Sequence, residues 1–171
     1  MNDSTLLRTP LHTWHTANGG KLIDFGGWDM PVQYAPGILQ EHLSTRRAGG
    51  LFDVCHMGRF RVTGRDAVPF LQRALTNDAE ALQPFQAQYT LLCNENGGVI
   101  DDAYLYRWTG TEYGLIVNAS NRAKDLEHLR KLASGFGGAI LEDRSEAIGM
   151  IAFQGSLSER ILGGVVESGR L

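Results

Sequence analysis

Cysteine is scarce in this sequence, and it is not clustered. The two cysteines, Cys55 and Cys93, lie far apart and show neither a Cys-x-x-Cys pair nor a Cys/His spacing typical of metal ligands. Neither a disulfide framework nor a structural zinc site is therefore predicted. A reducing compartment, the cytoplasm, is expected.

The sequence also lacks an excess of positive charge and any long hydrophobic run. It has 16 Lys and Arg against 19 Asp and Glu, a formal net charge of -3, and its basic side chains occur only in short groups such as Arg46-Arg47. A nucleic-acid surface requires clustered basic residues, and a membrane span requires about 18 or more apolar residues. The first nine residues lack the basic and apolar segments of a signal peptide. We therefore expect no nucleic-acid partner and no membrane association.

What the sequence does contain is the balance of a globular protein, with 43% hydrophobic and 20% charged residues. Its 171 residues suffice for one substantial core or two small ones. The first third is interrupted by glycine. Thr9 is predicted to cap a short helix through Trp14, followed by a strand over 21–25, irregular chain around 26–31 and a helix over 38–47.

The middle of the sequence has a sharper pattern. Its most distinct feature is a hairpin, strands 89–93 and 99–106, joined by the turn Asn-Glu-Asn-Gly-Gly. A strand with Phe60 and Val62 and a helix capped by Asp66 precede it, and a strand over 113–118, a helix over 121–133 and a strand over 139–142 follow. The order β-α-β-β-β-α-β predicts an α+β fold, an antiparallel sheet with helices on one face, similar to a ferredoxin-like split β-α-β unit.

The end of the sequence is less regular. A last strand is predicted over 148–153, and Ser156 is predicted to cap a short helix that ends at Leu162. Residues 163–171 neither complete a helix nor form a recognisable polar terminus, so the sequence is expected to be interrupted there.

A carboxylate pair, Asp101-Asp102, lies in the second strand of the hairpin, where aspartate is unfavourable. Alternation places Asp102 on one face with Tyr104 and Tyr106, and Asp101 on the other. A carboxylate beside aromatic rings suits a flat heterocycle that stacks and presents a ring nitrogen to an anion or base. The plain alternative is that both acids face water or bind a backbone amide.

No other catalytic pattern is as informative. The five histidines show no His-x-x-x-His spacing, and there is no Gly-x-Ser-x-Gly elbow and no Walker loop. Cys55 lies next to His56, but neighbours in a strand point to opposite faces, which argues against an activated thiol. Gly26-Gly27 is explained by a turn.

Several motifs occur in the order typical of one family. They are Thr-Pro-Leu at 9–11, Asp-Phe-Gly-Gly-Trp-Asp-Met-Pro-Val-Gln-Tyr at 24–34, Leu-Phe-Asp-Val-Cys-His-Met-Gly at 51–58, Leu-Thr-Asn-Asp at 75–78, Asn-Glu-Asn-Gly-Gly-Val-Ile-Asp-Asp at 94–102, Val-Asn-Ala-Ser-Asn at 117–121 and Ile-Ala-Phe-Gln-Gly at 151–155. Together they cover nearly the whole sequence, which resembles the N-terminal portion of the glycine cleavage system T-protein family. Cys55 and Ser156 depart from it, because that family usually has serine and proline there.

The resemblance implies a cloverleaf of three domains. Residues 1–56 and 147–171 would be parts of a discontinuous first, folate-binding domain, and residues 57–146 an inserted α+β domain. A C-terminal barrel domain would be absent, together with later acidic and arginine residues that grip the pterin and the glutamate tail.

The resemblance also implies an enzyme of glycine catabolism and one-carbon metabolism. In this family the lipoylated H-protein carries an aminomethyl group on its dihydrolipoyl arm, and the group passes to tetrahydrofolate with release of ammonia and no metal. The catalytic aspartate of the family matches Asp102, and its folate-binding positions match Met57, Tyr89, Asp102 and Asn118, with Tyr106 as a further candidate. The plain alternatives are core packing for Met57, Tyr89 and Tyr106 and helix capping for Asn118.

Two other functions are also compatible with the sequence. The first is a non-catalytic folate-binding or interaction module, like the relatives that serve in iron–sulfur cluster assembly, although their Lys-Gly-Cys-type signature is absent. The second is a folate-dependent demethylase relative. For the aminomethyltransferase hypothesis, Asp102→Asn is expected to leave folding largely intact and to cut transfer strongly, whereas Asp101→Asn is expected to affect catalysis less and stability more.

Overall fold

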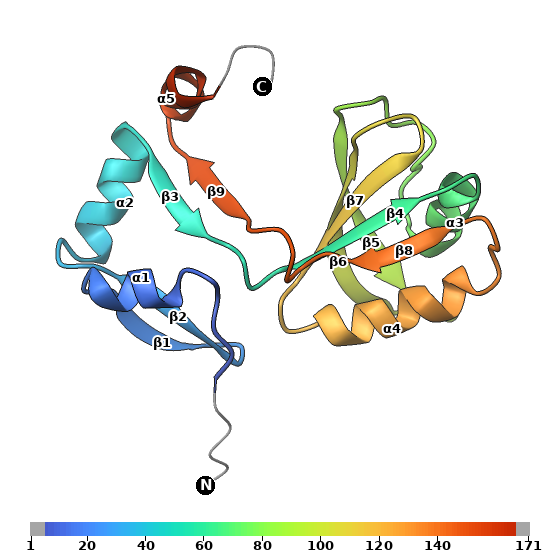
Figure 1. Ribbon diagram of the computed structural model, residues 1–171, viewed down its shortest axis with the longest axis horizontal. Helices are drawn as coiled ribbons and strands as arrows, with labels where there is room; N and C mark the ends of the chain where they lie inside the picture. Colours follow the sequence, from blue (N-terminus) through green and yellow to red (C-terminus); the bar gives the residue numbers. More distant parts are fainter. Residues whose placement is uncertain (1–5, 167–171) are drawn as a thin grey trace, which may run out of the picture. The chain divides into compact units, whose positions relative to one another are not determined.

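The computed structural model describes residues 6–166, which form two compact units (Figure 1). Unit 2 is the continuous segment Met57–Ile148, and unit 1 joins the residues up to His56 to those from Gly149 onward. Across residues 6–166, none of the helices combines the length and the apolar character that a membrane crossing requires.

Unit 2 is an antiparallel sheet with two helices. Its elements are β4 (Gly58–Thr63), α3 (Ala67–Ala74), β5 (Ala87–Cys93), β6 (Val99–Arg107), β7 (Glu112–Val117), α4 (Arg122–Ala133) and β8 (Ile140–Asp143). Within this fully described segment the sheet order is β5-β6-β7-β4-β8, and every neighbouring pair is antiparallel. The hairpin β5–β6 is followed directly by β7. On its other edge β7 pairs with β4, the first strand of unit 2, and β8 pairs with the far edge of β4.

One face of this sheet forms the core of unit 2. Along β6, Ala103 and Leu105 are buried while Tyr104 and Tyr106 are exposed, as strand alternation requires. The buried residues of the strands pack with Phe70 of α3 and Leu129 of α4 in a single hydrophobic cluster. The opposite face of β5 and β6 therefore remains available for a site.

Unit 1 contains shorter elements. They are α1 (His12–Ala17), β1 (Lys21–Phe25), β2 (Trp28–Gln33), α2 (Ile38–Arg47), β3 (Gly50–Asp53), β9 (Ile151–Gln154) and α5 (Ser158–Val165). In the described part of this unit, β1 pairs with β2 and β3 pairs with β9, both antiparallel. Gly26 and Gly27 join β1 to β2 with φ of 60° and 88°, a conformation that a two-residue hairpin turn needs and that glycine adopts without strain.

The predicted α+β class with antiparallel sheets is confirmed, as are the β4–β8 element order and the hairpin. The predicted irregular chain after Gly27 is wrong, because Trp28–Gln33 is a strand that includes Pro31. A two-stranded sheet has only edge strands, which tolerate proline. The last strand begins at Ile151, later than predicted, and α5 extends to Val165, beyond Leu162.

Three predicted helix caps use their side chains elsewhere. Leu11 occupies the N-cap of α1, and Thr9 instead donates its hydroxyl to Asp53 at 2.5 Å. Asp66 has the N-cap position of α3, but its carboxylate accepts from the backbone N–H of Gly138 at 2.7 Å. Ser156 donates to the carbonyl of Arg47, and α5 begins after Leu157. The predicted interruption concerns residues 163–171, of which 167–171 lie outside the described residues.

Candidate functional site

A row of tyrosines lies on the sheet face of unit 2 that the helices leave open. Tyr89 on β5 is directly opposite Tyr104 on β6, and their ring centroids are 5.7 Å apart in an edge-to-face arrangement. Tyr106 continues the row, with its ring 6.1 Å from that of Tyr104. The three rings are 49%, 48% and 39% exposed, respectively, so the row offers apolar faces rather than filling a core. Tyr104 belongs to this row but was not assigned to the site from the sequence.

Asp102 lies at one end of this row. It is half-buried on the same face of β6 as Tyr104, and Leu91, two residues from Tyr89, is its partner across the β5–β6 pair. Partial desolvation, then the negative charge of Asp102, raises the pKa of the Tyr89 phenol. The face predicted for Asp102 and Tyr106 from strand alternation is therefore the one observed.

Asn118 connects the two aspartates. Its side-chain nitrogen lies 2.9 Å from Oδ1 of Asp102 and 3.0 Å from Oδ1 of Asp101, and its backbone N–H donates to Oδ2 of Asp101 at 3.0 Å. The predicted alternative, capping of the helix by this side chain, is not what the contacts show, because Asn121 occupies the N-cap of α4. The amide fixes the position of Asp102 relative to β7.

Two other predicted residues, Met57 and Tyr106, are placed relative to Asp102 by strand pairing. Met57 is half-buried and directly precedes Gly58, whose partner is Val117, so strand pairing brings it to the end of β7 where Asn118 lies. Tyr106 is four residues beyond Asp102 along β6, a distance of roughly 13 Å at 3.3 Å per residue. Tyr106 therefore lies at the end of the tyrosine row that is farther from Asp102.

Asp101 is more strongly bound than the sequence suggested. It is 5% exposed and accepts from Asn118 and, at 2.6 Å, from the side-chain nitrogen of Asn121. Desolvation opposes its charge, but the hydrogen bonds from Asn118, Asp125 and Asn121 outweigh that effect and lower the pKa of its carboxyl. Asp125 was missed, although Asn121 and Asp125 are four residues apart and therefore share a helix face.

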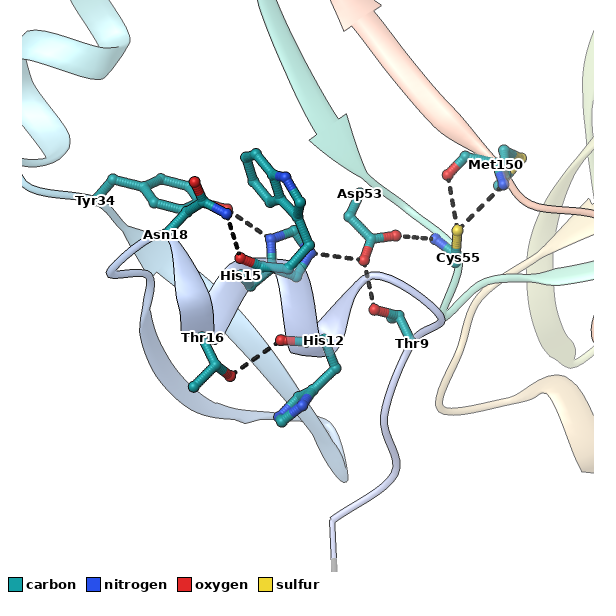
Figure 2. A network of polar contacts seen from close by, with 10 residues as sticks. Thr9, His12, His15, Thr16, Asn18, Tyr34, Asp53, Cys55 and Met150 are labelled. Carbon is teal, nitrogen blue, oxygen red and sulfur yellow. Dashed lines mark hydrogen bonds and ion pairs between the residues drawn. The ribbon is translucent and has the colours of Figure 1, made fainter.

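Unit 1 holds a second polar cluster, which we call the Asp53 network (Figure 2). Asp53 accepts from the Thr9 hydroxyl, from the backbone N–H of Cys55 at 2.9 Å and from Nε2 of His15 at 2.9 Å. The other ring nitrogen of His15, Nδ1, lies 2.6 Å from the hydroxyl of Tyr34. Because an ionised carboxylate only accepts, Nε2 of His15 is the donor to Asp53.

The Asp53 network shifts the pKa values of Asp53 and Tyr34 in opposite directions. Burial opposes the charge on Asp53, but the bonds from Thr9, His15 and Cys55 prevail and lower the pKa of its carboxyl. Desolvation, then the charges of Glu41 and Asp53, raises the pKa of the Tyr34 phenol. A cavity of about 470 Å³ beside His15 and Tyr34 is lined mainly by apolar side chains, including Trp14 and Phe52.

Cys55 belongs to the Asp53 network through its backbone N–H. It lies in a turn and not in a strand, is 5% exposed, and its sulfur lies 3.2 Å from both the N–H and the carbonyl of Met150. Within residues 6–166 no group of three His, Cys, Asp or Glu side chains is arranged to hold a metal ion.

The surface of unit 2 thus combines a carboxylate, an amide that fixes it and a row of phenol rings. A flat heterocycle can stack on such rings, and the carboxylate can accept a proton from a ring nitrogen or stabilise a developing positive charge. The fold and this surface define an α+β protein suited to bind a heteroaromatic ligand.

Comparison with known proteins specifies the class further. The family described as the GCVT N-terminal domain matches residues 11–170, and the chain therefore belongs to that family. Among its relatives, an aminomethyltransferase of Thermus thermophilus is 49% identical over 160 residues, 94% of this chain and 45% of the relative. The aminomethyltransferase of Deinococcus deserti is 46% identical over 160 residues, with 94% and 44% covered.

The fold agrees with the sequence relationship. The crystal structure of glycine cleavage system aminomethyltransferase T from Bartonella henselae superposes with a TM-score of 0.90 at 36% identity, covering 98% of this chain and 46% of that one. The chain thus spans less than half the length of the relatives that it matches.

Proposed function

We propose that this chain forms part of a folate-dependent aminomethyltransferase of the glycine cleavage system. The observation that carries the proposal is the half-buried Asp102, fixed by Asn118 at the end of the row formed by Tyr89, Tyr104 and Tyr106. The names of the relatives, aminomethyltransferases, support the same reaction class. We further propose that unit 2 corresponds to the inserted domain and unit 1 to part of the first domain.

In the proposed reaction the aminomethyl carbon passes from the sulfur of the dihydrolipoyl arm of H-protein to N5 of tetrahydrofolate. Loss of ammonia builds positive charge on that carbon, and the carbon–N5 bond leaves a proton on N5. Asp102 stabilises the charge and then accepts this proton. N10 of the folate then attacks the same carbon, and the carbon–sulfur bond breaks. The proton that N10 loses goes to the departing sulfur, which gives the dihydrolipoyl thiol and 5,10-methylenetetrahydrofolate. The proposed compartment is the cytoplasm, supported by two free cysteines.

The residues of this surface fit a pterin ring. Tyr89 and Tyr104 present exposed ring faces, and Asp102 and Asn118 present an acceptor and an amide for the polar ring edge. Met57, at the same end of β7 as Asn118, is proposed as an apolar neighbour of the ring, and Tyr106 as the outer contact.

The first experiment is a calorimetric titration of the 171-residue chain with tetrahydrofolate, after circular dichroism has shown that it is folded. Micromolar binding that Asp102→Asn or Tyr89→Ala weakens about tenfold supports the proposed site. Binding that neither substitution changes would place the folate elsewhere. The matched control is Asp78→Asn, an exposed acid in the same unit.

The reaction itself is tested in a complete protein that contains this chain. Asp102→Asn is expected to retain the fold and to lower methylenetetrahydrofolate formation from H-protein by about 100-fold or more. Asp101→Asn is expected to lower stability more, because Asp101 is buried and accepts from Asn118 and Asn121. Normal turnover by the Asp102→Asn enzyme would overturn the assignment, and turnover only with methylated amines would indicate a demethylase.

A further inference from the structure

A buried carboxylic acid lies behind the proposed site and has no part in the mechanism above. Asp125 is 0% exposed in α4, and neither of its oxygens receives a hydrogen bond from an N–H or hydroxyl group of the described residues. A buried carboxylate without a donor is strongly unfavourable, so this group retains a proton. Desolvation, then the hydrogen bond and charge of Asp101, raises the pKa of Asp125 to about 8.

The pKa shifts identify Asp101 as the partner of Asp125, because a hydrogen bond between the two carboxyl groups lowers the pKa of Asp101 and raises the pKa of Asp125. Asp101 already accepts from the backbone and side-chain nitrogens of Asn118 and from Asn121, all donors that favour its ionised form. Two carboxyl groups in contact do not both ionise readily, and the one with the donors keeps the negative charge. Asp125 is therefore the neutral member of the pair and Asp101 the charged one.

The pair reaches Asp102 through a single amide group. The side-chain nitrogen of Asn118 has two hydrogens, and its carboxylate acceptors are Oδ1 of Asp101 at 3.0 Å and Oδ1 of Asp102 at 2.9 Å. A change in the charge or position of Asp101 therefore changes the orientation of the amide that holds Asp102.

Few other charges act on Asp125. From β6 they are Asp101 and Asp102, and from α4 itself it is Lys124, whose ammonium donates to the carbonyl of Ile100 at 2.9 Å. On β8, Asp143 pairs with Arg122 at 3.1 Å, and on α3, Arg73 acts on His128. Ionisation of Asp125 would therefore place a second negative charge against Asp101, opposed mainly by Lys124.

We propose that Asp125 is a positioning residue for the proposed transfer, acting through the relay Asp125–Asp101–Asn118–Asp102. While Asp125 holds its proton, Asp101 remains an acceptor in contact with Asn118, and the amide holds Asp102 toward the tyrosine row. When Asp125 ionises, repulsion displaces Asp101, and Asp102 loses its fixed position. The purpose of the relay rests on the proposed function, but its existence does not.

The relay is tested by NMR on the folded chain without ligand, with the carboxyl groups of Asp and the side-chain amides of Asn labelled. We expect the Asp125 carboxyl and the Asn118 side-chain amide to shift together, with one midpoint near pH 8. An Asn118 amide that stays constant while Asp125 titrates, or an Asp125 midpoint near its ordinary value, would overturn the proposal. The wild-type titration needs no variant and so remains decisive if a substitution prevents folding.

Two variants sharpen the test. Asp125→Asn keeps a neutral donor toward Asp101, so the Asn118 amide should remain at its low-pH position throughout, whereas Glu127→Gln, on the exposed face of the same helix, should titrate like wild type. In calorimetric titrations with tetrahydrofolate, the wild-type chain should bind about tenfold more weakly at pH 9.5 than at pH 6.5. The affinity of Asp125→Asn should be the same at both pH values. An Asn118 amide that shifts with Asp125 in a chain that binds no folate would support the relay and count against a folate site formed by this surface alone.

Discussion

Unit 2 buries phenylalanine, leucine and valine side chains from its sheet and helices around one core, whereas unit 1 buries only a few apolar side chains beside a group of hydrogen-bonded polar ones. In unit 1 the buried hydrophobic residues of the described chain are Trp28, Met30 and Cys55, and beside them lie Thr9 and His15 of the Asp53 network. The stability of unit 2 therefore depends mainly on the apolar area that it buries. The stability of unit 1 depends more on the geometry of a few hydrogen-bond donors and acceptors.

The same contrast applies to their surfaces. Unit 1 exposes large apolar side chains such as Trp14, Leu51 and Ile151, while unit 2 exposes the tyrosine row next to Asp102. Isolated exposed apolar residues are ordinary, but the tyrosines lie side by side and adjoin a fixed carboxylate. Substitutions in the two units should therefore have effects of different kinds.

The largest expected effect is on the core of unit 2. Phe70→Ala removes a fully buried ring and should lower the free energy of unfolding by about 3–5 kcal/mol. Urea denaturation followed by the fluorescence of Trp108, in the same unit, measures the change. Phe85→Ala is the matched control, because Phe85 is 93% exposed and should change stability by only about 0.5 kcal/mol. Similar losses for both would contradict the packed core.

A smaller effect is expected when the Asp53 network is broken. Asp53→Asn leaves an amide where a carboxylate accepted three hydrogen bonds, and should cost about 2–3 kcal/mol. Hydrogen exchange of unit 1 amides measures the loss. Asp24→Asn serves as control, since Asp24 is exposed and its asparagine can still accept from the N–H of Gly27. A loss of hydrogen-exchange protection confined to unit 2 would contradict the idea that unit 1 is the unit that depends on the Asp53 network.

Gly155 gives a test of the backbone of unit 1. Its φ is +129°, and an added Cβ would lie 2.5 Å from the carbonyl oxygens of Thr45 and Ala48. Gly155→Ala should destabilise unit 1 by about 1–3 kcal/mol. Gly164→Ala, in α5 with nothing within 4 Å of its Cβ, should instead stabilise by about 0.5–1 kcal/mol. Thermal unfolding measures both stability changes. If both substitutions stabilised unit 1, or both destabilised it, the proposed difference in backbone environment would be refuted.

The last comparison separates the units by the pH dependence of their stability. Because the folded pKa of Asp125 is raised, its contribution is complete below about pH 4, its unfolded value, and is lost as pH rises through about 8. For Asp53, whose folded pKa is lowered, the contribution is present above about pH 4 and is lost as pH falls through the folded value.

Between pH 5 and 7 the stability of unit 2 should therefore fall by about 1 kcal/mol per pH unit relative to Asp125→Asn. Urea midpoints of the two proteins across this range measure the slope. Parallel pH profiles would mean that Asp125 is ionised in the folded protein.

Local pattern predicted the hairpin, the helix Ile38–Arg47 and the shared face of Asp102, Tyr104 and Tyr106. These features depend on turn residues and on the periods of strand and helix, which neighbouring residues set. Helix caps were predicted less well. Thr9, Asp66 and Ser156 each bind a group more than 40 residues away in the sequence, and no local pattern indicates such a partner.

The sequence by itself determined the α+β class, the alternation that turns Asp102 toward the tyrosines and the family to which the chain belongs. Only the tertiary structure decided which polar groups share a proton or a hydrogen bond. Asp125 meets Asp101, and His15 meets Asp53, because strand register and helix packing bring together segments that are far apart along the chain. Burial then makes those contacts strong, since a polar group removed from water depends entirely on the partners that the fold provides.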